Sequence, residues 1–180
     1  MEEKAPLLLT IAVLGGTGKE GKGLAYRWAK AGYKVVIGSR IPEKAVTAAS
    51  EIIELLEGSS SVVGASNLEA AEQAEIVVLT VPYAAHRDTL EGVKDALKGK
   101  LLIDVTVPLV PPKVTKVQMP AAGSAAQEAK AILGDDVQVV AAFQNISHEH
   151  LMTDSDVQCD VLVTGSSKES RLEAIKLVEA

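Results

Sequence analysis

The sequence predicts an α/β fold in which a mostly parallel, doubly wound sheet carries helices on both faces. Short aliphatic runs bounded by turn residues alternate with longer segments of helical period, as in repeated βα units. Hydrophobic residues make up 47% of the chain and aromatic residues 3%, so Ala, Val, Leu and Ile must form the core. Strands covered on both faces have this composition. The length of 180 residues suits one domain, which we place at residues 1–180.

Seven aliphatic runs predict the strands, and helices fill most of the gaps between them. The first helix begins inside a glycine-rich loop and ends near Ala31, closed by Gly32. The second covers residues 42–57, since a proline at the first turn has no hydrogen bond to lose. Ser166 and Glu169 match a capping box, so a last helix should run from there to the C-terminal residue. The strands are expected at residues 8–14, 34–37, 61–64, 76–81, 101–104, 138–142 and 160–163.

Charge and cysteine content exclude several classes of function. The formal charge of −6 argues against a broad electropositive surface for nucleic acid or anionic membranes. The apolar run at residues 6–14 is too short to span a membrane and lacks the features of a signal peptide. Cys159 is the sole cysteine, which rules out an internal disulfide and fits a reducing, cytoplasmic setting. We expect it to be a buried hydrophobe at the start of the last strand.

One glycine-rich motif directly follows the first aliphatic run and precedes a segment of helical period. Its G-x-G-x-x-G spacing binds a dinucleotide pyrophosphate at a helix N-terminus. Gly16 permits a tight turn, Gly18 lets the backbone approach the phosphates, and Gly21 lets the helix pack on the strand. We therefore predict a Rossmann-type site rather than an ordinary glycine-rich turn. The motif consists of Gly16, Thr17, Gly18, Lys19, Glu20 and Gly21.

The end of the second strand indicates which dinucleotide binds. An NAD site usually has Asp or Glu about twenty residues beyond the loop, where it accepts from the ribose 2′-hydroxyl. Here Ser39 and Arg40 occupy that place, and Lys44 follows one helical turn later. A hydroxyl donor and a planar guanidinium suit a 2′-phosphate. The pattern predicts NADP, although Arg40 and Lys44 could instead be solvated surface cations.

The other strand ends should form the rest of the site, because ligands of doubly wound sheets lie outside the carboxyl ends of the strands. Val81 and Pro82 leave the fourth strand, residues 105–108 leave the fifth, and Ala142 ends the sixth. Phe143 and Asn145 sit where a flat substrate would stack, or are merely packing and turn residues. Residues 105–120 contain four prolines and no helical period, and we expect a functional loop there.

Several residues suggest other chemistry that the surrounding sequence does not support. His148, Glu149 and His150 resemble a metal cluster, but no further His or Cys lies at ligand spacing, and we expect no metal. His86 could reach the nicotinamide side of the site or be a surface histidine at a helix N-terminus. A hydrolase is rejected because the chain has no G-x-S-x-G motif.

These residues together resemble the NADPH-dependent reductases of coenzyme F420, a deazaflavin; the family is also called F420H2:NADP oxidoreductases. The likeness covers nearly the whole chain, and the cytosolic reductase domains of the STEAP membrane proteins are more distantly similar. It is carried by residues 14–23, by residues 36–40 with Lys44, and by residues 79–83, 104–108, 141–145 and 159–165.

The resemblance implies hydride transfer between the nicotinamide C4 and the deazaflavin C5 in a cytoplasmic homodimer. It places Thr17 to Glu20, Ser39, Arg40, Lys44 and Val81 at positions that hold NADP. Such a reaction needs two stacked rings and no side-chain nucleophile, so we name no catalytic residue. Lys113 and Lys116 are candidates for the acidic deazaflavin tail.

One departure from the family leaves alternatives open. Family members usually continue past the last helix with a strand and a helical segment that help to close the deazaflavin pocket and the dimer interface, whereas this chain stops at Ala180. The alternatives are a reductase of a flavin or ferric chelate, and a non-catalytic NADP-binding sensor. An acceptor panel would separate them.

Overall fold

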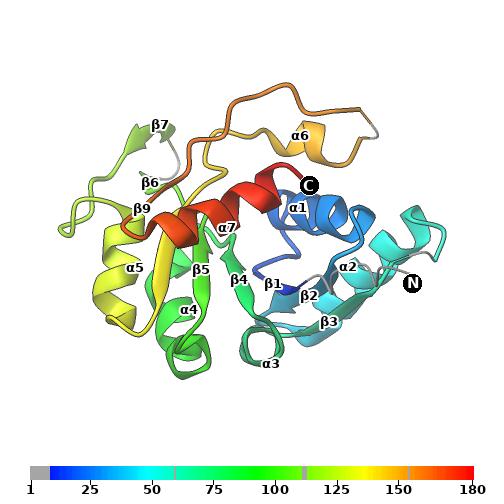
Figure 1. Ribbon diagram of the computed structural model, residues 1–180, viewed down its shortest axis with the longest axis horizontal. Helices are drawn as coiled ribbons and strands as arrows, with labels where there is room; N and C mark the ends of the chain where they lie inside the picture. Colours follow the sequence, from blue (N-terminus) through cyan, green and yellow to red (C-terminus); the bar gives the residue numbers. More distant parts are fainter. Residues whose placement is uncertain (1–8, 59, 111–112, 154) are drawn as a thin grey trace, which may run out of the picture.

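The computed structural model describes residues 9–58, 60–110, 113–153 and 155–180. In these residues one sheet has seven strands in the order β3-β2-β1-β4-β5-β8-β9 (Figure 1). Neighbouring strands from β3 to β8 in this order pair in parallel. Strand β9 is antiparallel to its neighbour β8. The strands are β1 (Thr10–Leu14), β2 (Lys34–Ser39), β3 (Val62–Ser66), β4 (Ile76–Leu79), β5 (Leu101–Asp104), β8 (Gln138–Ala141) and β9 (Thr164–Gly165).

Helices cover both faces of this sheet, as predicted, and each face has its own core. Alternate side chains of β1 divide between the two cores, with Ile11 and Val13 in one and Ala12 and Leu14 in the other. The first core contains residues from α1 (Lys19–Lys30), α2 (Pro42–Leu55), α6 (His148–Leu151) and α7 (Lys168–Val178). The second contains residues from α3 (Asn67–Gln73), α4 (His86–Val93), α5 (Ala125–Leu133) and the 3-10 turn η2 (Lys94–Leu97). A further 3-10 turn, η1 (Tyr83–Ala85), precedes α4.

The second helix ends at Leu55 rather than at residue 57, and the last helix differs from the prediction at both ends. Helix α7 begins at Lys168, not at Ser166, because Ser167 is the cap: its hydroxyl oxygen accepts from the Ser170 N–H. The helix ends at Val178 rather than at the last residue. At the end of α1 the prediction is confirmed, since Gly32 follows the Ala31 cap with φ +93°.

The last predicted strand, at residues 160–163, is wrong. After α6 the chain crosses above the sheet, drawn in orange in Figure 1, and pairs with β8 only at β9. Leu162 is therefore 72% exposed. Cys159 is also exposed, which corrects its prediction as a buried residue.

The proline-rich segment contains two strands that were not predicted. Within residues 105–120 lies an antiparallel pair formed by β6 (Leu109–Val110) and β7 (Lys113–Val117). Three of the five residues of β7 are Val or Thr, and β-branched residues favour strands. No helix in the described ranges combines the length and the apolar character that a membrane span needs.

Candidate cofactor groove

A groove of about 500 Å³ lies where the carboxyl ends of β1 and β4 meet. The strand order reverses at this point, and such crevices bind the ligands of doubly wound folds. It is lined by Gly15, Thr17, Gly18, Lys19, Glu20, Ser39, Arg40, Ile41, Lys44, Asn67, Thr80, Val81, Pro82, Ala85, Val105, Thr106, Val107 and Leu109.

The turn at the start of the glycine loop is made by Gly15 rather than by Gly16. Gly15 has φ +74°, and a Cβ there would lie 2.6 Å from Val81 Cγ1. Gly16 is buried below the groove, and its N–H donates to the carbonyl oxygens of Val13 and Gly38. The expectation that Gly16 makes the tight turn is thus corrected, because the φ > 0 position falls one residue earlier.

The loop leads directly into α1, whose N-terminus faces the groove. Gly18 is the N-cap and no side chain caps it, so the first-turn N–H groups point toward the groove without a capping partner. Gly21 lies behind them and does not line the groove, since a Cβ there would collide with Thr80 Oγ1. The close packing predicted for Gly21 is therefore confirmed. This end of the helix can bind an anion.

Basic residues gather at the end of β2. Ser39 is buried, and its oxygen accepts from the Ile41 N–H at 3.1 Å, which leaves its hydroxyl hydrogen available. Arg40 is exposed beside it, and Lys44 follows in the first turn of α2. Lys19 adds a third cation from the start of α1. The arrangement suits a phosphate group at this end.

Glu20 is an acidic exception in the groove. Its Oε1 atom is buried and has no hydrogen-bond partner among the described residues. Burial raises the pKa of its carboxyl group. A protonated Glu20 would repel the phosphates of a bound dinucleotide less than a carboxylate would.

The opposite end of the groove is formed by the chain leaving β4 and β5. Val81 and Pro82 line it as expected. Thr106 Oγ1 donates to the Val81 carbonyl oxygen at 3.4 Å and so links the two strand ends. Thr80 Oγ1 donates to the Leu14 carbonyl oxygen at 2.9 Å and ties β4 to β1.

The end of β8 does not contribute to the groove. Ala142, one of the candidate site residues, is fully buried in the first core and is not part of the lining. Phe143 is also buried, with its ring centroid 5.8 Å from that of Trp28. Asn145 Nδ2 donates to the Asp160 carbonyl oxygen. The packing interpretation therefore fits Phe143, whereas Asn145 is exposed and both interpretations of it stay open.

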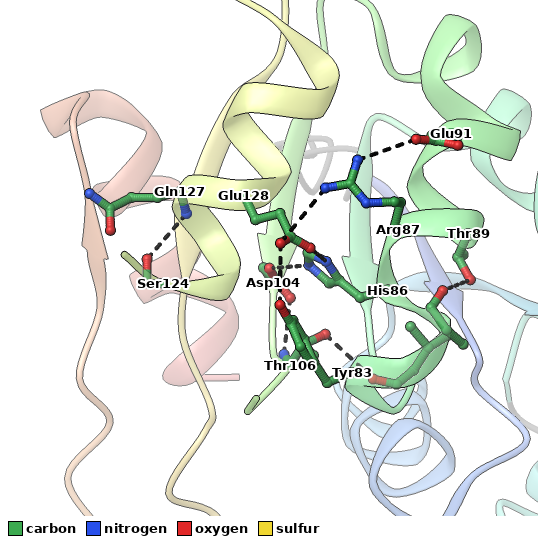
Figure 2. Close-up of polar contacts among 12 residues, drawn as sticks. Tyr83, His86, Arg87, Thr89, Glu91, Asp104, Thr106, Ser124, Gln127 and Glu128 are labelled. Carbon is green, nitrogen blue, oxygen red and sulfur yellow. Dashed lines mark hydrogen bonds and ion pairs between the residues drawn. The ribbon is translucent and has the colours of Figure 1, made fainter. Parts of the chain in front are cut away.

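Behind the Pro82 end of the groove, a buried polar cluster surrounds His86. Its Nε2 lies 2.9 Å from Asp104 Oδ2 and its Nδ1 lies 3.3 Å from Glu128 Oε1. Figure 2 shows the imidazole between these two carboxyl groups, with Tyr83 hydroxyl on Glu128. His86 is fully buried and does not line the groove, so both expectations for it, at the nicotinamide side or on the surface, are wrong.

Some lining residues escaped prediction, and Asn67 is the clearest case. It follows β3 directly, and its Oδ1 accepts from the Gly15 N–H at 3.3 Å. Because β3 ends at Ser66 rather than at residue 64, Asn67 stands at the carboxyl edge of the sheet. The Ser66–Glu69 capping box was the signal in the sequence that could have placed it.

The remaining candidates lie outside the groove. His148 and His150 are on α6, and in the described ranges no three His, Cys, Asp or Glu residues are grouped to hold a metal ion. Lys116 is exposed on β7, whereas the side chain of Lys113 lies outside the described residues.

Comparison with known proteins identifies the family. The family described as NADP oxidoreductase, coenzyme F420-dependent, matches residues 10–108. The F420-dependent NADP reductase of Methanothermobacter marburgensis is 46% identical over 178 residues, which span 95% of this chain and 79% of that protein. The F420-dependent NADP reductase of Methanocaldococcus jannaschii is 39% identical, over 94% of this chain and 78% of that protein.

Solved structures agree with the fold. A protein from Arthrobacter sp. FB24, assigned as an F420-dependent NADP reductase, superposes with a TM-score of 0.76 at 26% identity, over 95% of this chain and 80% of that one. The reductive aminase of Aspergillus terreus, at 15% identity and a TM-score of 0.68, covers 95% of this chain and 52% of its own and shares the fold. The chain therefore belongs to the coenzyme F420-dependent NADP oxidoreductases and is an NADP-dependent oxidoreductase.

Proposed function

We propose that this protein transfers a hydride between NADP(H), held in the groove, and coenzyme F420. Support comes from one groove that joins three basic side chains at the end of β2 and the start of α1 to the strand-end loops at Val81 and Thr106. A dinucleotide needs both a phosphate site and a more apolar ring site within one crevice. The second substrate, coenzyme F420, is inferred from the family to which the chain belongs.

The residues present fit the phosphates of NADP. Gly18 leaves open space above the helix N-terminus, because a Cβ there would meet only the Gly15 carbonyl oxygen, at 3.5 Å. We assign the pyrophosphate to the N–H groups at this terminus, with the loop from Gly16 to Gly21 supporting them. Thr17, Lys19 and Glu20 line the same part of the groove.

The 2′-phosphate is assigned to Ser39, Arg40 and Lys44. Arg40 can bind two phosphate oxygens through its planar guanidinium, and Lys44 acts as a point charge. The buried Ser39 hydroxyl, held by the Ile41 N–H, donates the remaining hydrogen bond. No carboxylate takes the place at the end of β2 where NAD-specific domains bind the ribose.

Val81, Pro82 and Thr106 form the end of the groove assigned to the nicotinamide ring. NADPH bound there would supply the hydride, and the deazaflavin ring would accept it. The role of these residues is to hold the ring, to exclude water and to leave one face open for the second substrate. Ala142 is fully buried, so we do not propose it as a contact of the nicotinamide ring. We propose no catalytic side chain and no metal.

An acceptor panel tests this function. We expect oxidised coenzyme F420 to be reduced by NADPH much faster than by NADH, and flavins or ferric chelates to react slowly. Rapid reduction of a flavin or ferric chelate alone would favour that class of reductase. Tight NADPH binding without turnover of any acceptor would favour a sensor domain.

We further propose a single NADP-binding domain that acts as a cytoplasmic homodimer and binds neither nucleic acid nor membranes. The formal charge of −6 argues against a binding site for polyanions. The exposed lone cysteine fits a reducing compartment. The exposed Lys116 is the candidate contact for the acidic deazaflavin tail. Light scattering of the purified protein would test the dimer, since a monomeric mass contradicts it.

A further inference from the structure

The ionisable side chains of His86, Asp104 and Glu128 meet in one cluster. His86 and Asp104 are fully buried, and Glu128 has 16% of its side chain exposed. The three residues come from α4, β5 and α5, which are separate in sequence. Burying ionisable groups costs free energy unless they are paired. We therefore expect a buried cluster of this kind to contribute to function.

The two contacts of His86 define the protonation of its ring. Ionised carboxyl groups accept hydrogen bonds and do not donate them, so with both carboxyl groups ionised an imidazole that bonds one of them through each nitrogen carries both protons. Burial lowers the pKa of His86, but the hydrogen bonds and charges of Asp104, and then of Glu128, outweigh it and raise the pKa above its ordinary value. In that state the ring is an imidazolium that joins two carboxylates.

Asp104 connects this imidazolium to the wall of the groove. Its second oxygen, Oδ1, accepts from the Thr106 N–H at 3.0 Å, and its own carbonyl oxygen accepts from Gln144 Nε2 at 2.7 Å. Thr106 in turn bonds the Val81 carbonyl oxygen. A continuous path therefore runs from His86 to the two chain segments that line the ring end of the groove (Figure 2).

His86 also determines the position of the second segment directly. It is the first residue of α4 and follows η1, so its ring fixes the turn that carries Pro82 and Ala85 into the groove. Tyr83, within that turn, donates its hydroxyl to Glu128 Oε2 at 3.2 Å. Both segments at the ring end thus depend on the same imidazolium.

We propose that His86, bridging Asp104 and Glu128, is a positioning residue that holds the loops after β4 and β5 in the geometry required for hydride transfer. The inference rests on the proposed function of the groove. His86 is fully buried and absent from the lining, so it does not touch the substrate and acts through Thr106, Pro82 and Ala85.

Substitution of His86 by Gln removes the bridging cation and keeps a side chain that can donate. We expect His86→Gln to bind NADPH within about threefold of the wild type, because the phosphate site is at the other end of the groove. The first-order rate of hydride transfer should fall about tenfold to a hundredfold, the loss expected for misplaced rings. The fluorescence emission of bound NADPH, which reports the surroundings of its nicotinamide, should shift toward that of the free cofactor.

A matched pair of glutamates provides a readout that a purely structural role would not change. Glu128 and Glu91 both contact Arg87, at 3.8 and 3.4 Å, but of the two Glu128 alone reaches His86. The groups facing His86 are Asp104, Glu128 and Tyr83, and Arg87 contacts Glu128. In Glu128→Gln the decline of the transfer rate at alkaline pH should begin at a lower pH than in the wild type, whereas Glu91→Gln should match the wild type.

The outcomes separate the inference from the proposed function. A transfer rate and an NADPH emission within twofold of wild type in His86→Gln would overturn the positioning role. If His86→Gln does not fold, an unchanged alkaline decline in Glu128→Gln would overturn it instead. If the wild type binds NADPH but reduces no deazaflavin, the proposed function fails, and the emission of bound NADPH still decides the role of His86.

Discussion

The backbone N–H of Gly15 donates to Oδ1 of Asn67, 3.3 Å away, and joins the turn after β1 to the first residue of α3. Asn67 also lines the groove. Asn67→Asp keeps the accepting oxygen and places a negative charge beside the cofactor phosphates. We expect this variant to unfold like the wild type but to bind NADPH several-fold more weakly, as measured by calorimetric titration.

Asn67→Ala is the matched variant, because it removes the acceptor without adding charge. The lost hydrogen bond should lower the free energy of unfolding by about 1 kcal/mol. The two effects would then separate: the alanine variant loses stability and the aspartate variant loses affinity. Equal behaviour of the two variants in both measurements would show that Asn67 has no such double role.

Gly15 should tolerate a side chain less well than another glycine with the same backbone conformation. Gly15 and Gly58 have φ of +74° and +76°, but a Cβ at Gly15 meets Val81 at 2.6 Å whereas one at Gly58 meets nothing within 4 Å. Both alanine variants carry the cost of a left-handed residue, about 1–2 kcal/mol. Thermal unfolding should show a clearly larger loss for Gly15→Ala, and equal losses would contradict the contact.

Arg40 is the residue that should separate NADPH from NADH. Arg40→Asp is expected to weaken NADPH binding at least about tenfold and to leave NADH binding nearly unchanged, because only NADPH carries the 2′-phosphate. Fluorescence titration of both cofactors measures this. Lys98→Asp, at a 59% exposed side chain outside the groove, makes the same change in net charge and should affect neither cofactor. Parallel losses of both cofactors in Arg40→Asp would refute the assignment.

The stability contributed by His86 should depend on pH. Its pKa in the folded protein is raised above the unfolded value of about 6.5. The folded state therefore binds the proton more tightly, and this stabilisation is complete below about pH 6.5 and lost as the pH rises through the folded pKa. Urea unfolding should thus show the largest gap between wild type and His86→Gln at mildly acid pH, with a smaller gap at alkaline pH.

The exposed His150 provides the control for this experiment. His150→Gln makes the same substitution away from the cluster around Asp104. Its free energy of unfolding should follow the wild type at both pH values. A gap for His86→Gln that is constant, or that widens as the pH rises, would mean that the imidazolium does not stabilise the fold.

The parts of the fold that local pattern specifies were predictable. The strand β5 was predicted at its observed bounds, and the Gly32 helix end followed from a glycine that tolerates φ > 0. The strand expected at residues 160–163 failed because an aliphatic run indicates burial but not pairing, and here the chain crosses the sheet before it meets β8. Pairing of an edge strand depends on tertiary path rather than on local composition.

The groove was predictable to the extent that strand ends define it. Ser39, Arg40, Val81 and Pro82 line it because each stands at the carboxyl end of a strand near the reversal of strand order. Ala142 met the same rule and failed, because two strands, β4 and β5, separate β8 from β1, and the end of β8 turns into the core. Strand order is a long-range property, so local reasoning could not reject Ala142.

The cluster around His86 could not be predicted at all from local pattern. Its members lie 18 and 42 residues apart from His86 along the chain, on three elements that meet only after the sheet has formed. A lone histidine after a strand has no periodic or motif signal that indicates burial or partners. Distances in the folded chain were needed to bring these groups together.

Deuterium transfer tests the central claim most directly. The protein is mixed with oxidised coenzyme F420 and NADPH carrying deuterium at both positions of nicotinamide C4, and the reduced deazaflavin is analysed by mass spectrometry. Direct hydride transfer predicts loss of the deazaflavin absorbance together with one deuterium in the product. Absence of reduction, or a reduced product without deuterium, would contradict the account.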